Sequence, residues 1–410
     1  MTPSSAEETT RIATRRLAKR AVAYQPFFWD EVGEILNAHP GAIYFGNGAP
    51  NRKTIPYERL QEASKIAWAE ASDALDYGEL AGYKPLRELI CERMTAQGIV
   101  AKPDDVMITN GSQQGIDIIC RLFTEPGDTV IVESPTYLGA LQAINPFEVN
   151  YLPIPIDDEG LNVDALGDAL ANLPTPPKLI YTIPTFQNPT GITMSLRRRE
   201  ALLEVARRHA ILVLEDDPYG ELFFDETPPE PPLRALDPEV IYLGTFSKTV
   251  APGLRVGWMT APKEIISLSL AAREASDIHG DRILTRTVYH AAKDFLDDHL
   301  IGARAFYRRR RDLMLDALAE YMPPGVTWVE PRGGFFVWVT LPDGLAADDK
   351  LTLAADGGVV YLPGSWFYPN QEERSSFRLS YSGLTEDEII EGIRRLGVAT
   401  SEFMNNQRAG

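Results

Sequence analysis

Short apolar runs alternate with helical patterns between about residue 105 and residue 260 of the chain. Several of these runs are apolar on both faces, which is typical of strands that helices cover on both sides. The strands predicted from the runs are Val106–Thr109, Thr129–Glu133, Leu179–Ile183, Ile211–Glu215, Val240–Thr245 and Val256–Thr260. The helices predicted around them are Leu60–Ser72, Ser112–Phe123 and Ser195–His209. This alternation predicts an α/β fold with a mostly parallel sheet between helices.

The pattern changes after residue 260. A long helical region is predicted from Lys263 to about Tyr321, and it is followed by strand-like runs at Gly334–Leu341, Val359–Tyr361 and Phe377–Tyr381. This mixture predicts a second, smaller α+β domain whose boundary lies near residue 290. We therefore expect an N-terminal segment over residues 1–48 that packs with the small domain and the candidate site, a large domain over 49–290 and a small C-terminal domain over 291–410.

Composition and charge exclude several classes of protein. The chain has 410 residues, and its 40 basic and 58 acidic side chains give a formal charge of −18. That charge would repel a phosphate backbone, so we expect no nucleic-acid partner. No apolar run approaches the roughly 20 residues of a membrane helix. The N-terminus lacks the apolar core of a signal peptide, so a cytoplasmic location is expected. Cys91 and Cys120 are too few for a zinc cluster or a disulfide framework, and both are interpreted as buried thiols.

Polar residues follow the ends of the predicted strands, where ligands of open α/β sheets bind. Gly111, Ser112 and Gln113 begin a helix and could offer a hydroxyl group and free backbone N–H groups to a phosphate. Tyr137 follows the next strand and could stack on a planar ligand. Taken singly, each signal has an ordinary structural explanation, since Gly-Ser before a helix is commonly an N-cap and an aromatic side chain commonly packs in a core.

The remaining strand ends carry an amide, an acid and an amine. Asn188 lies in a loop that two prolines and a glycine constrain, and Asp216 ends an apolar strand, where an unpaired carboxylate is costly to bury. Lys248 ends another strand, where burial and nearby cations lower the pKa of an amine. A neutral amine can attack a carbonyl to form a Schiff base. Arg255 follows in the same loop and is suited to bidentate phosphate binding.

Together these residues fit one cofactor. They supply a phosphate cradle, a stacking aromatic ring, an amide, a carboxylate–tyrosine pair at Asp216 and Tyr219, a lysine and an arginine. Pyridoxal 5′-phosphate needs a lysine for its aldehyde and an acid for its pyridinium nitrogen. The sequence therefore predicts a pyridoxal-phosphate site.

The order of these motifs resembles the class I and II aminotransferases of fold type I. The resemblance rests on Ser247-Lys248-x-x-x-Pro252-Gly253-x-Arg255-x-Gly257, Asn188-Pro189-Thr190-Gly191, Asp216-x-x-Tyr219 and Phe377-Arg378-Leu379-Ser380. It extends from about Tyr44 to Leu396, and the pattern is most similar to the branch with 2-aminoadipate and aromatic aminotransferases and the aminotransferase-like domains of MocR-type regulators. It implies a large domain with a mostly parallel sheet of the seven-stranded type and a small α+β domain.

The resemblance also implies a role for each candidate residue. Lys248 would form the Schiff base and later move a proton, and Asp216 would keep the pyridine nitrogen protonated. Asn188 and Tyr219 would hydrogen-bond the phenolic oxygen, which makes Lys248, Asp216 and Tyr219 the catalytic residues. The further cofactor-binding residues would be Gly111, Ser112, Gln113, Tyr137, Ser247 and Arg255, with Tyr77 reaching in from the partner subunit of a homodimer. The substrate would be held by Arg378, Asn188 and Gly48, with the guanidinium of Arg378 on the α-carboxylate.

The activity implied is the transfer of an amino group from an L-amino acid to a 2-oxo acid by ping-pong chemistry. Two alternatives remain open at this point. One is another pyridoxal-phosphate reaction on amino acids, such as β-elimination, decarboxylation or oxidation, which fold alone does not exclude. The other is a non-catalytic sensor domain of the MocR type.

The substrate's side chain also stays open. A basic N-terminal helix could reach a distal carboxylate through Arg15, Arg16 or Arg20. An aromatic side chain could be favoured by the aromatic-rich segments Phe27, Phe28, Trp29 and Tyr361–Tyr368. Arg286 stands where the related branch often has glutamine, and a further cation near the site would change what the pocket accepts.

Overall fold

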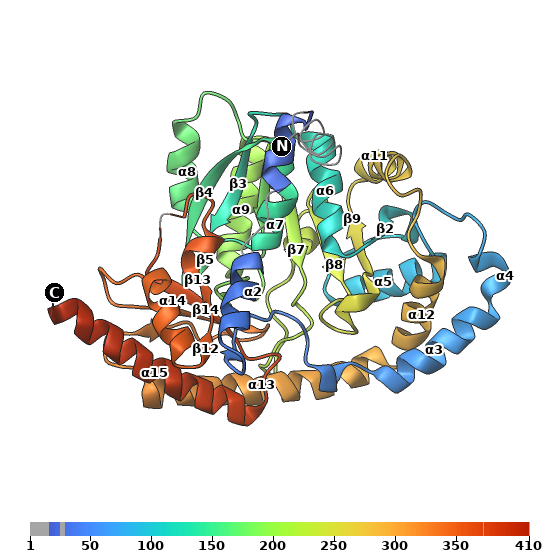
Figure 1. Cartoon of the computed structure of the whole chain (residues 1–410). Coiled ribbons are helices and arrows are strands. Elements are labelled where there is room, and N and C mark those ends of the chain that lie inside the picture. Colours follow the sequence, from blue (N-terminus) through green and yellow to red (C-terminus); the bar gives the residue numbers. More distant parts are fainter. Residues whose placement is uncertain (1–15, 25–28, 372, 410) are drawn as a thin grey trace, which may run out of the picture.

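The computed structural model describes residues 16–24, 29–371 and 373–409, and an eight-stranded sheet forms its largest layer (Figure 1). In spatial order the strands are β2 (Val106–Thr109), β9 (Gly257–Thr260), β8 (Ile241–Thr245), β7 (Leu212–Asp217), β6 (Leu179–Thr182), β3 (Thr129–Ser134), β4 (Asn150–Asp157) and β5 (Gly160–Leu161). The run from β8 to β4 is parallel, whereas β9 is antiparallel to both of its neighbours. The predicted mostly parallel sheet is confirmed, and the two-residue β5 adds an eighth strand to the expected seven.

Helices cover both faces of this sheet because consecutive residues of its strands are apolar. On β3, Val130 and Val132 face one apolar cluster, and Ile131 faces the other. The first cluster is covered by α6 (Ser112–Phe123), α7 (Leu138–Ile144) and α11 (Lys263–Glu274). The second is covered by α8 (Val163–Ala171), α9 (Leu196–Arg208) and α10 (Leu233–Leu236). This is the two-sided covering that the apolar runs predicted.

The longest of the strands that sequence patterning missed is β4, with eight residues. Its sequence contains Pro153 and Pro155, which argue against a strand inside a sheet because proline has no backbone N–H to donate. The two prolines are two residues apart on the strand, so their ring nitrogens point in the same direction. That direction is away from β3 and toward the edge of the sheet. There β5 pairs only with Ile156 and Asp157. An edge position therefore accommodates both prolines.

The predicted helical region from Lys263 to Tyr321 consists of three helices. They are α11, α12 (Arg282–Ala292) and α13 (Leu296–Tyr321). The first break contains Ile278 at a φ of 63°, and α12 then starts at the N-cap Asp281, whose carboxylate accepts a hydrogen bond from Leu284 N. The long α13 packs along α15 (Glu386–Ala409), and Figure 1 shows both at the lower side of the molecule.

The C-terminal part contains a second, antiparallel sheet. Its strands, in spatial order, are β10 (Thr327–Trp328), β11 (Phe336–Thr340), β14 (Ser376–Ser380) and β13 (Leu362–Pro363). Helix α14 (Ala347–Asp356) packs beside β13, and α15 packs against α14. A separate parallel pair joins β1 (Ile43–Tyr44) to β12 (Val359–Val360), so the chain just before residue 48 pairs with the C-terminal part. The remaining α-helices of the described residues are α2 (Trp29–Ala38), α3 (Tyr57–Ala69), α4 (Ala71–Ala74) and α5 (Lys84–Ala96). The domain boundaries at residues 48 and 290 stay a prediction.

Two further sequence expectations concern thiols and membranes. Cys91 and Cys120 are buried free thiols, as predicted. Among the helices of the described residues, none is long and apolar enough to cross a membrane.

Candidate active site

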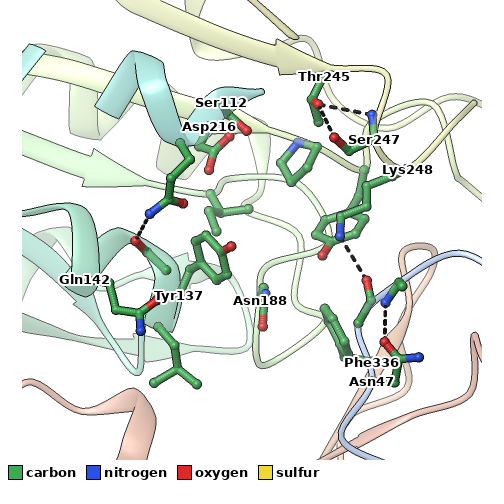
Figure 2. A pocket seen from close by; sticks show the side chains of 18 of the residues that line it. Asn47, Ser112, Tyr137, Gln142, Asn188, Asp216, Thr245, Ser247, Lys248 and Phe336 are labelled. Carbon is green, nitrogen blue, oxygen red and sulfur yellow. Dashed lines mark hydrogen bonds between the residues drawn. The ribbon is translucent and has the colours of Figure 1, made fainter. Parts of the chain in front are cut away.

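A cavity of about 350 Å³ lies beyond the carboxyl ends of the parallel strands (Figure 2). The predicted site residues that line it are Gly48, Ser112, Gln113, Tyr137, Asn188, Asp216, Tyr219, Ser247, Lys248, Arg255 and Arg378. They come from the end of β7, from the loops after β1, β3, β6, β7 and β8, from the start of α6, and from β14 of the smaller sheet. The strand ends therefore bring together the residues that sequence reasoning singled out.

One corner of the cavity has groups whose chemistry suits an anion. Helix α6 begins after Gly111, which has a φ of 76° and provides no side-chain cap, so the first N–H groups of the helix are free to bind a ligand. Ser112 at the start of this helix lines the cavity, as do Ser247 and Arg255. Arg255 donates hydrogen bonds to Ser247 Oγ at 3.4 Å and to the Asn110 carbonyl at 3.0 Å. A helix N-terminus with two hydroxyl groups and a guanidinium suits a phosphate.

Lys248 follows β8 and extends its amine into the middle of the cavity. The Nζ atom donates a hydrogen bond to the Gly48 carbonyl at 2.9 Å, which Figure 2 shows as a dashed line. Burial, with the nearby guanidinium groups of Arg378 and Arg255, lowers the pKa of this amine to about 8, and Asp216 opposes that shift. A useful fraction of the amine is therefore neutral near physiological pH and able to react with a carbonyl.

Asp216 lies on β7 with 2% of its surface exposed. Its Oδ2 atom accepts a hydrogen bond from the Tyr181 hydroxyl at 2.9 Å. Its Oδ1 atom is buried and has no hydrogen bond among the described residues, although Ser112 lies beside the carboxyl group (Figure 2). Burial raises the pKa of Asp216 to about 7. A cation placed at Oδ1 would satisfy that oxygen and favour the ionised carboxylate.

A second cationic group lies across the cavity. Arg378 is buried on β14 and donates through Nη1 to Asn188 Oδ1 at 2.8 Å and through Nη2 to the Gly46 carbonyl at 2.7 Å. Its Nε atom is buried without a partner among the described residues. Burial lowers the pKa of Arg378 to about 10, so the guanidinium stays charged at neutral pH. No carboxylate neutralises it in the contacts of the described chain, which leaves its charge for a ligand.

Aromatic rings form the walls between these groups. Tyr137 lines the cavity beside Asp216 and Gln142, and Tyr219 lies below the Lys248 amine at 5.9 Å from its ring centroid. The ring of Tyr219 is fixed by edge contacts with Phe335 and Phe336. Burial raises the pKa of both tyrosines, so each keeps its hydroxyl proton.

Some predicted residues lie elsewhere. Tyr77 is 82% exposed and does not line the cavity of its own chain. Gly111 lies behind the phosphate corner, where a Cβ atom would approach Arg255 Nη2 to 2.5 Å. Arg286 lies in a separate cavity, with its guanidinium 4.4 Å from the centroid of Tyr83. It therefore adds no charge to the candidate site within one chain.

The residues suggested for the substrate's side chain are also placed away from the cavity. Arg16 and Arg20 are exposed and do not line it, and Tyr361 is buried against Phe377. Arg15, Phe27 and Phe28, and the side chain of Trp29, lie outside the described residues. Of the segment 361–368, only Leu362 reaches the cavity.

Sequence reasoning missed several lining residues. Leu138 and Gln142 lie one turn apart on α7, Phe336 comes from β11 and Leu362 from β13. The i and i+4 spacing of Leu138 and Gln142 places them on one helix face, but nothing in the sequence indicates which ligand that face would meet.

These features define the class of enzyme. A lysine of lowered pKa, a buried acid with one open oxygen, and a phosphate corner fit the aldehyde, the pyridine nitrogen and the phosphate of pyridoxal 5′-phosphate. A second cation, Arg378, remains for the carboxylate of an amino acid.

Comparison with known proteins gives the same class. The family model for aminotransferase class I and II matches residues 42–396. The aromatic-amino-acid aminotransferase 1 of Thermococcus litoralis is 42% identical over 91% of this chain and 92% of its own length. The 2-aminoadipate transaminase of Thermus thermophilus is 37% identical over 89% of this chain and 91% of its own length. The crystal structure of kynurenine aminotransferase from Pyrococcus horikoshii has a TM-score of 0.90 and 41% identity, covering 95% of this chain and 98% of that one.

The chain therefore belongs to the class I and II aminotransferases, and it is a pyridoxal-phosphate-dependent transaminase of fold type I. Its relatives also include an uncharacterised HTH-type transcriptional regulator of Bacillus subtilis, which is 31% identical over 81% of this chain. Both branches that the motifs resembled are thus found among its relatives.

Proposed function

We propose that the cavity around Lys248 carries out both halves of amino transfer between an L-amino acid and a 2-oxo acid. The observation that carries this proposal is that the Lys248 amine and the uncompensated Arg378 guanidinium share one cavity with Asp216. When bound, pyridoxal phosphate supplies an aldehyde carbon that takes the amino group and a ring that takes up electrons released at the substrate's Cα.

Five groups of the chain would hold this cofactor. Lys248 Nζ would hold the aldehyde carbon, and Asp216 Oδ1 would accept a hydrogen bond from the protonated ring nitrogen. The corner of Ser112, Ser247 and Arg255, with Gly111 and Gln113 beside it, would bind the phosphate. Tyr137 would stack on the ring, and Asn188 and Tyr219 would hydrogen-bond its phenolic oxygen.

Arg378 and Lys248 would then divide the work on the substrate. The Arg378 guanidinium, fixed by Asn188 and the Gly46 carbonyl, would bind the α-carboxylate and fix the amino acid's orientation. Gly48 would let the substrate approach, because a Cβ atom there would lie 3.0 Å from Phe336 Cζ and narrow the entrance. Once its amine is released, Lys248 Nζ would move the proton at the substrate's Cα. Its lowered pKa suits that exchange near neutral pH.

The remaining lining favours substrates with an uncharged side chain. The cations that line the cavity among the described residues are Lys248, Arg255 and Arg378, and each already has a role above. No described cation is left for a second carboxylate. Leu138 lines the cavity with an apolar side chain, and Gln142 offers an amide that makes no hydrogen bond within the described chain. We therefore infer aromatic or large aliphatic amino acids as amino donors, in preference to glutamate or 2-aminoadipate.

The proposed homodimer explains why Tyr77 lies outside its own cavity. Tyr77 and, on α3, Tyr57, Ile66 and Trp68 are large apolar side chains that are exposed in the single chain. In a dimer Tyr77 would complete the partner's phosphate corner. Mixing Lys248→Ala chains with Tyr77→Ala chains tests this, because a hybrid would contain one intact site and recover activity. The cytoplasmic location also remains a prediction.

The test of the function is a half-reaction without any oxo acid. Wild-type holoprotein with phenylalanine or leucine should convert its cofactor to pyridoxamine phosphate, faster than with glutamate or 2-aminoadipate, and Lys248→Ala should convert none. Equal rates with all four would refute the side-chain inference alone. Loss of ammonia or carbon dioxide without pyridoxamine phosphate would instead favour elimination or decarboxylation. Cofactor binding with no reaction would favour a sensor.

A further inference from the structure

Two tyrosine–aspartate pairs lie on three neighbouring strands. Asp216 and Asp217 are consecutive on β7. Tyr181 on β6 donates a hydrogen bond to Asp216 Oδ2 at 2.9 Å, and Tyr242 on β8 donates one to Asp217 Oδ2 at 3.0 Å. Both tyrosines are at most 1% exposed. Since successive side chains of a strand point to opposite faces, the two pairs lie on opposite faces of the sheet.

The pairs differ in what the second carboxylate oxygen contacts. Asp217 Oδ1 accepts a hydrogen bond from Gly220 N at 2.8 Å, so that carboxylate is satisfied by its own loop. Asp216 Oδ1 has no hydrogen bond among the described residues and faces the cavity that Asp217 does not line. Tyr181 thus fixes one oxygen of Asp216 and leaves the other for a ligand.

The hydrogen bond from Tyr181 affects whether the Asp216 carboxyl group is ionised. Burial and the neighbouring Asp217 raise the pKa of Asp216, whereas Tyr181, Ser112 on α6 and Lys248 after β8 lower it. Of the groups that lower the pKa of Asp216, Tyr181 has the largest effect. Burial also raises the pKa of Tyr181 far above its usual value, so the phenol stays a donor throughout the working range of pH. Tyr137 and Tyr219, the other titratable groups facing this carboxyl, stay neutral for the same reason.

We propose that Tyr181 is a positioning residue that keeps the Asp216 carboxylate ionised and turns Oδ1 toward the cofactor's ring nitrogen. This inference rests on the proposed function, because it assigns to Asp216 the nitrogen of pyridoxal phosphate. Tyr181 does not line the cavity, so it acts only through Asp216. Its hydroxyl donates a side-chain hydrogen bond from β6 to this acid.

The test compares Tyr181→Phe with Tyr242→Phe, which removes the matching hydroxyl from the pair on the opposite face. Titration of each apo-protein with pyridoxal phosphate should give a dissociation constant about tenfold higher or more for Tyr181→Phe, since a hydrogen bond to a charged group is lost. The acidic limit of cofactor binding should also move upward by about one pH unit. Tyr242→Phe should leave both values at those of the wild type. Measurements are made where circular dichroism shows each variant fully folded.

A cofactor analogue separates positioning from a general structural effect. In 1-deazapyridoxal phosphate the ring nitrogen is replaced by carbon, so Tyr181→Phe should not weaken its binding. The effect on pyridoxal phosphate should also disappear in an Asp216→Asn background, because the acid through which Tyr181 acts is gone. Equal weakening for both cofactors, or in both backgrounds, would overturn the proposal. Wild-type protein that binds no pyridoxal phosphate would refute the proposed function instead.

Discussion

Gly111 at the start of α6 allows a quantitative test of the phosphate corner. Its φ of 76° and ψ of 169° lie in a region that only glycine adopts readily, and an alanine there costs about 1–3 kcal/mol of backbone strain. The added Cβ would also lie 2.5 Å from Arg255 Nη2 and 3.0 Å from Arg255 Cζ. Because Arg255 is an exposed, flexible side chain, its guanidinium would move away and leave the phosphate position.

The loss of one charge-assisted hydrogen bond is about 1.5–3 kcal/mol, so Gly111→Ala should raise the dissociation constant of pyridoxal phosphate roughly tenfold to a hundredfold. Fluorescence titration of the apo-protein measures this constant. Gly253→Ala is the matched control, because Gly253 lies in the Arg255 loop and its Cβ would meet nothing within 4 Å. If both alanine variants bind the cofactor as the wild type does, the corner does not hold the phosphate.

Three further predictions concern charge. Arg378→Lys should raise KM for amino acids about tenfold or more with a smaller change in kcat, since lysine cannot form the bidentate contact with a carboxylate. The control is Arg374→Lys, at an exposed position of the same segment, which should change neither constant. The rate at which the apo-protein binds pyridoxal phosphate should increase as the pH rises through about 8, because burial lowers the pKa of Lys248 and only the neutral amine reacts. A rate that does not change with pH would contradict this. Burial lowers the pKa of Lys350 to about 7, so the unfolded chain binds a proton that the folded chain has lost, and stability should rise with pH from about 7 to about 10. Lys350→Met should flatten that rise in urea unfolding and stabilise the protein most at neutral pH, whereas Lys65→Met, at an exposed position, should not.

Strand ends could be predicted because local patterns determine them. Val106–Thr109 and Ser112–Phe123 have the predicted bounds, and the polar residues that follow each parallel strand meet at one edge of the sheet. The prolines of β4 hid a strand whose edge position depends on its neighbours. The break after Glu274 was missed because Ile278 adopts a left-handed conformation that no local signal favours.

Residue patterns predicted the site where a residue lies at a strand end, and the family resemblance added Arg378 in the middle of β14. Tyr181 is part of an apolar run, and its hydroxyl gains a role only when β6 pairs with β7 and places it against Asp216. Tyr77 and Arg286 are the opposite case. The order of the family motifs suggests both residues for the site, but neither lines the cavity of the single chain.

The most direct test of the central claim is to reduce the holoprotein with borohydride, digest it and locate the cofactor by mass spectrometry. The account predicts one phosphopyridoxyl group per chain, on the peptide that contains Lys248, and none when Lys248→Ala is treated in the same way. A group fixed to another lysine of the wild-type chain, or no fixed group at all, would contradict the assignment of this cavity.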